Sequence, residues 1–274
     1  MNRIDQAFKR LKKEKKKAFI PYIAAGDPDL KTTVKLVEVL TEAGADIIEL
    51  GIPFSDPLAD GPTIQKAVQR SLEAGTTVKK ILEFTKDIRK KVEVPLVYMT
   101  YFNIIYNYGT DQFIKDAKKC GADGLIIPDL PLEESKEVKR IADKEDFCLI
   151  LLTAPTTSEN RFDKIARSSR GFIYHVSLTG VTGARKTLAT KLSAEVKKLK
   201  RITSKPLCVG FGVSTLKQAR EVALVADGVI VGSAIIKIIE NTLSDKRAML
   251  SKVQLFTKSL ARAIHDVSVV KGSK

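Results

Sequence analysis

Residues 42–51 read EAGADIIELG, a segment that passes from a helix end through Gly44 and Asp46 into an apolar strand. The same pattern returns as KCGADGLIIPD at 119–129 and as LVADGVIVG at 224–232. Gly44 and Gly121 occupy the position where glycine commonly terminates a helix. Three copies of one helix-to-strand unit predict a chain built from repeated α/β units.

Short apolar runs of this kind continue along the whole chain, separated by amphipathic helical stretches. They are rich in β-branched residues and almost continuously apolar, which is typical of parallel strands covered on both faces. Eight units without a linker-like segment predict a single (β/α)8 TIM-barrel domain over residues 1–274. The predicted strands are 18–25, 45–51, 94–101, 122–129, 147–154, 171–177, 205–212 and 227–232.

An open, doubly wound sheet is the alternative architecture. It would more often carry a glycine fingerprint after its first strand, where this chain reads AAGDPD. Two segments also depart from strict alternation. Residues 2–12 place Ile4, Phe8 and Leu11 on one face of an extra N-terminal helix, which we expect to plug the barrel floor. Residues 62–91 hold two helical stretches that split near Gly75.

The composition describes an ordinary soluble globular protein, with 44% hydrophobic and 29% charged residues. We expect no membrane span and no signal peptide, and therefore a cytoplasmic protein. Three widely spaced cysteines and two histidines argue against a zinc site or a histidine-rich metal centre. The net charge of +15 is interpreted as a solvated lysine coat, because the basic cluster at 10–17 lacks aromatic residues for nucleic-acid binding.

The segment ELGIPFSDPLADGPTIQ at 49–65 carries two acids near one strand end. Glu49 closes an apolar strand, and alternation with Ile48 and Leu50 directs it into the barrel mouth. Burial there predicts a raised pKa and a proton that can be exchanged near neutral pH. Asp60 lies in the following loop, where an ionised carboxylate would complement the protonated one. In barrels, chemistry belongs to this end of the strands.

Glycines follow the sixth predicted strand in GVTGA (180–184) and end the seventh and eighth in GFG (210–212) and GSA (232–234). The third opens a short helical run, and backbone N–H groups there predict an anion site. The loop 178–190 is rich in small residues and is predicted to be a mobile lid. Tyr174 shares a strand face with Phe172 and Val176, so it is either a hydroxyl directed into the mouth or a core aromatic. His175 is expected to be a core residue facing the helices.

Together these segments resemble the alpha subunit of tryptophan synthase. The motif at 49–65 is the most distinctive part of the resemblance, which runs from about Phe8 to the last helix. Tyr22 replaces a Phe that is common in the family, and Leu178 stands where some relatives carry a basic residue. The supporting segments are PYIAAGDP, IIPDLPLEES, LLTAPTT, SLTGVTGAR, VGFGVS and VGSAII.

The resemblance implies a lyase that cleaves indole-3-glycerol phosphate to indole and glyceraldehyde 3-phosphate without a cofactor in this subunit. By position, Glu49 would be the general acid/base, and Asp60 would accept a hydrogen bond from the indole N–H group. Tyr174 would support this pair of carboxyl groups. The implied phosphate cradle consists of Gly183, Gly212, Gly232 and Ser233. The implied indole pocket consists of Tyr22, Met99 and Phe211, and the implied lid contains Thr182.

The resemblance also implies a partner, the beta subunit of an alpha2-beta2 complex, which carries pyridoxal phosphate and receives indole. Pro53, Phe54, Asp56 and Asn103 fall in the implied partner surface. Two other functions compete with an active lyase. One is a catalytically weak subunit that only activates its beta partner, and the other is a basic nucleic-acid binder, which would lose binding steeply with salt.

Overall fold

The computed structural model describes residues 1–177, 185–210 and 212–267, and in the helix from Arg185 it describes side chains only from Leu192 on. The strands are β1 (Ala18–Ala24), β2 (Ile48–Gly51), β3 (Leu96–Met99), β4 (Gly124–Ile126), β5 (Cys148–Ile150), β6 (Leu152–Thr153), β7 (Ile173–Val176), β8 (Leu207–Gly210) and β9 (Gly228–Val231). The helices are α1 (Arg3–Glu14), α2 (Leu30–Glu42), α3 (Pro62–Glu73), α4 (Val78–Arg89), α5 (Phe102–Tyr108), α6 (Thr110–Cys120), α7 (Lys136–Lys144), α8 (Glu159–Ser168), α9 (Arg185–Ile202), α10 (Leu216–Ala223), α11 (Ser233–Glu240) and α12 (Lys246–His265).

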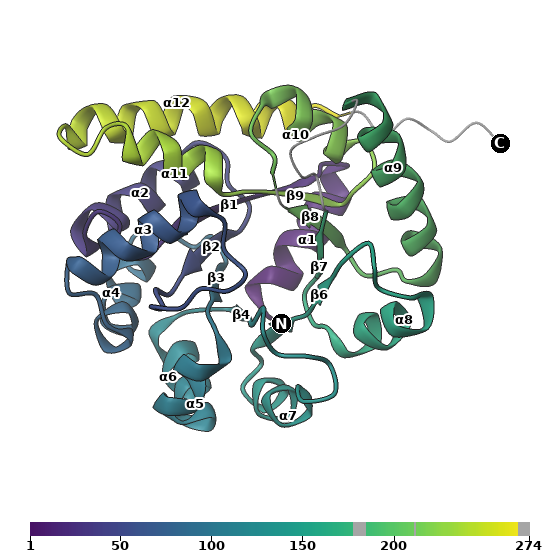
Figure 1. Ribbon diagram of the computed structural model, residues 1–274, viewed down its shortest axis with the longest axis horizontal. Helices are drawn as coiled ribbons and strands as arrows, with labels where there is room; N and C mark the ends of the chain where they lie inside the picture. Colours follow the sequence, from purple (N-terminus) through teal and green to yellow (C-terminus); the bar gives the residue numbers. More distant parts are fainter. Residues whose placement is uncertain (178–184, 211, 268–274) are drawn as a thin grey trace.

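The strands form one parallel sheet in the order β5-β4-β3-β2-β1-β9-β8-β7-β6. Its two ends, β5 and β6, are separated only by Leu151, so the sheet closes into the predicted barrel with helices around it (Figure 1). The fifth predicted strand, 147–154, is therefore split into β5 and β6. The reason is that the Leu151 N–H donates to the Ser169 hydroxyl at 3.1 Å and not to a neighbouring strand. The Arg170 N–H donates to the Leu149 carbonyl at 2.9 Å across the closure.

Alternation along β2 sorts its side chains as predicted. Ile48 and Leu50 belong to the large apolar cluster between sheet and helices. Ile47 belongs to a second cluster, inside the barrel, with Ile20 of β1 and Val97 of β3. The interior is therefore a packed core, as expected for an eight-unit barrel, and chemistry is confined to its rim.

Helix α1 plugs the barrel floor, as the sequence predicted. Ile4 and Leu11 join the interior cluster, and the Phe8 ring packs 5.8 Å from the ring of Phe172. Glycine is favoured at Gly124, where a Cβ would lie 2.9 Å from the Cys148 carbonyl oxygen and 3.0 Å from Ile4, and at Gly171, whose φ is +83°. The extra helix is thus part of the core.

The repeated Ala-Asp pattern has a structural role at this floor. Asp46, Asp123 and Asp227 each accept the backbone N–H at the start of the neighbouring strand, and each also binds a cation from α1 or the segment that follows it. The N–H donors are Phe19, Leu96 and Leu207 at 3.0, 3.0 and 3.1 Å, and the cations are Arg10, Arg3 and Lys17 at 2.7, 3.0 and 3.8 Å.

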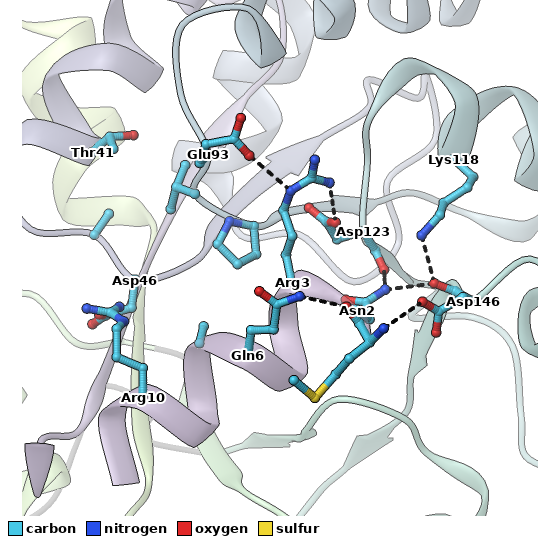
Figure 2. A pocket seen from close by; sticks show the side chains of 15 residues that line it. Asn2, Arg3, Gln6, Arg10, Thr41, Asp46, Glu93, Lys118, Asp123 and Asp146 are labelled. Atoms are coloured by element: carbon cyan, nitrogen blue, oxygen red, sulfur yellow. Dashed lines mark hydrogen bonds and ion pairs between the residues drawn. The ribbon is translucent and has the colours of Figure 1, made fainter. Parts of the chain in front are cut away.

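A cavity of about 780 Å³ opens beside α1 at this face. Figure 2 shows Arg3 in contact with Glu93 and Asp123, and Lys118 donating to the backbone carbonyl of Asp146. These ion pairs hold α1 against the barrel. Because the charged groups in them already have partners, they are not available to recognise a ligand. We therefore assign this face to stability.

Two further predictions about helices are confirmed. Residues 62–91 form α3 and α4, which are separated at 74–77, and Thr77 caps α4. Gly44 and Gly121 follow helix ends with positive φ angles of 103° and 104°. None of the described helices is both long and apolar enough to cross a membrane.

Candidate active site

Glu49 lies at the mouth end of β2, paired in register with Tyr22 of β1 and Val97 of β3. Its side chain is only 1% exposed, and neither carboxyl oxygen has a hydrogen-bond partner among the described residues. Burial, and then the nearby charge of Asp60, raises the pKa of Glu49 to about 8. At neutral pH this carboxyl group is therefore protonated and available as an acid.

Asp60 lies in the loop that joins β2 to α3. Its backbone is fixed at both ends, because its N–H donates to the Pro57 carbonyl at 3.2 Å and its carbonyl accepts from the Gln65 amide at 2.8 Å. Burial raises the pKa of Asp60 to about 6, against a hydrogen bond from the Tyr101 hydroxyl that lowers it. Near neutral pH, Asp60 is ionised while Glu49 is protonated, which is the division of roles that two-carboxyl catalysis requires.

Tyr101 is a site residue that the sequence reasoning missed. Its hydroxyl accepts the Ala59 N–H at 2.9 Å, beside Asp60 in the sequence, and it lowers the pKa of Asp60 against the effect of burial. The Phe54 ring packs on it with centroids 5.3 Å apart. The available signal was its position, since residue 101 ends the third predicted strand at the chemical face of the barrel.

Two tyrosine side chains complete the mouth, and glycines make room for them. A Cβ at Gly51 would lie 2.1 Å from the Tyr22 hydroxyl, and one at Gly210 would lie 2.5 Å from the Tyr174 hydroxyl. Burial raises the pKa of both phenols, and the two carboxyl groups raise it further. Both therefore stay protonated hydrogen-bond donors. Met99 is half-buried opposite Gly51 on β3.

The predicted anion site is only partly described. Gly232 precedes α11 and Ser233 is its first residue, so the N–H groups of Ser233 and Ala234 have no carbonyl partner within the helix, whereas that of Ile235 donates to the Gly232 carbonyl at 2.9 Å. Gly212 adopts a positive φ of 76°. Thr182, Gly183 and Phe211 lie outside the described residues. The predicted lid at 178–190 is helical from Arg185, where α9 begins, which is a correction to its length.

The four residues of the implied partner surface differ in exposure. Pro53 is buried, Phe54 is half-buried against Tyr101, and Asp56 and Asn103 are exposed. Leu58, which lies in the same loop as Asp56, is 92% exposed.

His175 is the predicted core residue. It is fully buried, and Nδ1 lies 2.9 Å from the Thr153 hydroxyl. Nε2 lies 3.5 Å from Glu195 of α9, too far for a good hydrogen bond, and burial lowers the pKa of the ring. In the described part of the chain, no group of three His, Cys, Asp or Glu residues is arranged to hold a metal ion.

Comparisons with known proteins agree with this geometry. The family model described as "Tryptophan synthase alpha chain" matches residues 8–265. The chain is 50% identical over 264 residues to the tryptophan synthase alpha chain of Caldanaerobacter subterraneus subsp. tengcongensis, covering 96% of this chain and 100% of the relative. It is 47% identical over 274 residues to that of Citrifermentans bemidjiense, covering both chains completely.

Solved structures give the same result. Tryptophan synthase subunit alpha from Legionella pneumophila superposes with a TM-score of 0.90 at 41% identity, covering 96% of this chain and 98% of that one. A tryptophan synthase structure from M. tuberculosis in its aminoacrylate-bound form gives a TM-score of 0.85 at 32% identity, covering 97% and 100%. The chain belongs to the tryptophan synthase alpha chain family.

Proposed function

We propose that this protein cleaves indole-3-glycerol phosphate to indole and glyceraldehyde 3-phosphate, as the alpha subunit of tryptophan synthase in tryptophan biosynthesis. The observation that carries the proposal is the buried, unpartnered carboxyl group of Glu49, whose pKa is raised to about 8 beside Asp60. Family membership supports the reaction, and the site supports the assignment of the acid. We also infer that residues 1–274 form one domain, since one sheet joins every strand of the described residues.

In the proposed mechanism, the protonated Glu49 gives its proton to the substituted carbon of the indole ring. The resulting ring cation is stabilised by Asp60, whose carboxylate accepts a hydrogen bond from the indole N–H group. Glu49, now ionised, takes the proton of the adjacent side-chain hydroxyl while the carbon–carbon bond breaks. The bond electrons return to the ring, an aldehyde forms, and Glu49 is protonated again. Tyr174 supports the pair as a neutral donor.

We assign the two ends of the substrate to two parts of the mouth. Tyr22 and Met99, with Phe211, contact the indole ring, and the start of α11 at Gly232 and Ser233, with Gly183 and Gly212, binds the phosphate. Binding the remote phosphate supplies energy that orients the reacting carbon against Glu49. Thr182 belongs to the proposed lid that would exclude water over this site.

The family name implies a complex with a beta subunit. We propose an alpha2-beta2 assembly, with pyridoxal phosphate in the beta subunit and no cofactor here, and with indole passing to the partner. The exposed side chains of Asp56, Leu58 and Asn103 support docking through the loops after β2 and β3. We also propose a cytoplasmic location, where the three buried free cysteines would stay reduced.

Steady-state cleavage of indole-3-glycerol phosphate, with and without a beta subunit, tests the proposal. Glu49→Gln keeps the shape of the side chain and removes its acid, and should lower kcat by about 10² to 10⁴. Near-full activity of that variant would refute the role of Glu49. Absence of cleavage by the unaltered protein, with activation of the beta subunit retained, would instead establish the weak-subunit alternative.

A further inference from the structure

Arg70, near the C-terminal end of α3, makes a two-pronged contact with a fully buried carboxylate. Its Nε and Nη2 atoms donate to the two oxygens of Asp27 at 2.7 and 2.8 Å, and Asp27 is 0% exposed in the loop between β1 and α2. Burial raises the pKa of Asp27, and the bonds from Arg70 oppose that rise. The buried charge thus depends on Arg70, and removing this partner would leave it uncompensated.

Neighbouring contacts make the junction between this loop and α3 stiff. The hydroxyl of Ser71 donates to the Ala25 carbonyl at 2.6 Å. Gly26 has a φ of +88°, and a Cβ there would lie 2.1 Å from the Thr76 hydroxyl. These contacts hold the loop after β1 against the C-terminal half of α3. They therefore also fix the direction of the α3 axis, and with it the position of Asp60 before the start of the helix.

Arg70 also contacts a second helix. Its Nη1 lies 3.8 Å from Glu240, the last residue of α11, and Lys66 of α3 lies 3.5 Å from the same carboxylate. Helices α3 and α11 pack side by side (Figure 1). One guanidinium thus joins the loop after β1, the helix that follows Asp60, and the helix that begins at Ser233.

The two helices extend from this junction to the two ends of the proposed site. Pro62, the first residue of α3, comes two residues after Asp60, and α11 starts at Ser233. At 1.5 Å per residue, each helix spans roughly 11–12 Å between the junction and its N-terminus. A change of angle at the junction would therefore move Asp60 relative to the anion site.

We propose that Arg70 is a positioning residue that fixes the separation between Asp60 and the anion site at Ser233, matching it to a substrate with an aromatic ring at one end and a phosphate at the other. The inference rests on the proposed function. Misplacement of a reacting group by about 1 Å can cost about 10²-fold in rate, so a fixed separation has a large effect on catalysis.

The test compares a linked ligand with its two halves. The probes are indole, glycerol 3-phosphate, and indole joined to phosphate by a three-carbon chain, with inhibition constants measured for each. Arg70→Lys keeps the charge but loses the planar fork. It should weaken the linked ligand about tenfold and each half less than twofold, because only the linked ligand needs both ends at once.

Two further variants keep the test decisive. Glu240→Gln breaks the link to α11, on a side chain that is 29% exposed, and should weaken the linked ligand about threefold. It serves alone if Arg70→Lys does not fold. Arg10→Lys makes the same exchange beside buried Asp46, at the opposite face of the barrel, and should change none of the constants.

The inference is overturned if both halves weaken as much as the linked ligand, or if the linked ligand is unaffected in both site variants. It is also overturned if the unaltered protein binds the linked ligand no better than the halves. Failure of the unaltered protein to cleave indole-3-glycerol phosphate, with the linked ligand still bound tightly, would refute the proposed function and leave the positioning result standing.

Discussion

Glu49→Gln should stabilise the protein while it removes activity. The folded protein holds the pKa of Glu49 at about 8, against 4.5 for the free group. Between these values the folded state keeps a proton that the unfolded chain has lost, so stability falls as pH rises through this window. Below pH 4.5 both states are protonated and the penalty is absent.

The size of the effect follows from the same two pKa values. A tenfold change in proton affinity corresponds to about 1.4 kcal/mol, so the penalty reaches about 3 kcal/mol at pH 7 and about 5 kcal/mol above pH 8. Glutamine resembles the protonated acid in shape and carries no charge. The variant should therefore match the unaltered protein at pH 4.5 and exceed it at pH 7, with a rise in Tm of roughly 6–12 °C.

Thermal melting followed by circular dichroism at pH 4.5, 7 and 8.5 measures this difference. Glu134→Gln, on an exposed side chain, is the control for loss of a negative charge on a basic protein and should leave Tm nearly unchanged at pH 7. A variant whose advantage is the same at all three pH values, or is absent at pH 8.5, would show that Glu49 is not held protonated by the fold.

Three further predictions concern the same site and its surroundings. The pH profile of kcat/KM should be bell-shaped, with an acid limb near 6 from Asp60 and a basic limb near 8 from Glu49; a flat profile between pH 5 and 9 would contradict both. Tyr101→Phe removes the hydroxyl that lowers the pKa of Asp60, so the acid limb should move to higher pH and kcat/KM should fall about tenfold, whereas Tyr106→Phe on an exposed ring should do neither. Leu58→Ser should weaken binding of the beta subunit about tenfold, measured by titration, without changing the Tm of the free chain; Leu255→Ser, also exposed, is the control, and equal losses would refute docking at this loop.

The barrel was predictable because its signals are local and repeated. Apolar strands, glycine helix ends and the N-terminal apolar stripe each follow from a few neighbouring residues. The split of the fifth strand was not, since it depends on a hydrogen bond between Leu151 and Ser169, eighteen residues apart. The function of the Ala-Asp repeats was also hidden, because each aspartate acts on the strand next to its own.

The candidate site could be proposed from the sequence only as far as strand alternation fixes the direction of side chains. It placed Glu49 and Tyr174 in the mouth, and loop composition indicated Asp60. It could not find Tyr101, whose importance comes from reaching Asp60 across 41 positions of sequence. It likewise missed Arg70, whose partners lie in two other segments of the chain.

Burial alone does not distinguish the carboxyl group that we propose as the catalytic acid; its lack of hydrogen-bond partners does. Asp46 and Glu49 stand three residues apart at the two ends of one strand segment, and both are almost fully buried. Asp46 is held by Arg10, His265 and the Phe19 N–H, all within 3.0 Å. Glu49 has no such partner in the described structure, and its burial is offset by a displaced pKa. The chain thus gives the buried Asp46 at the barrel floor hydrogen-bond partners, and it leaves the buried Glu49 at the mouth without them. The mouth is where the proposed reaction requires a proton to move.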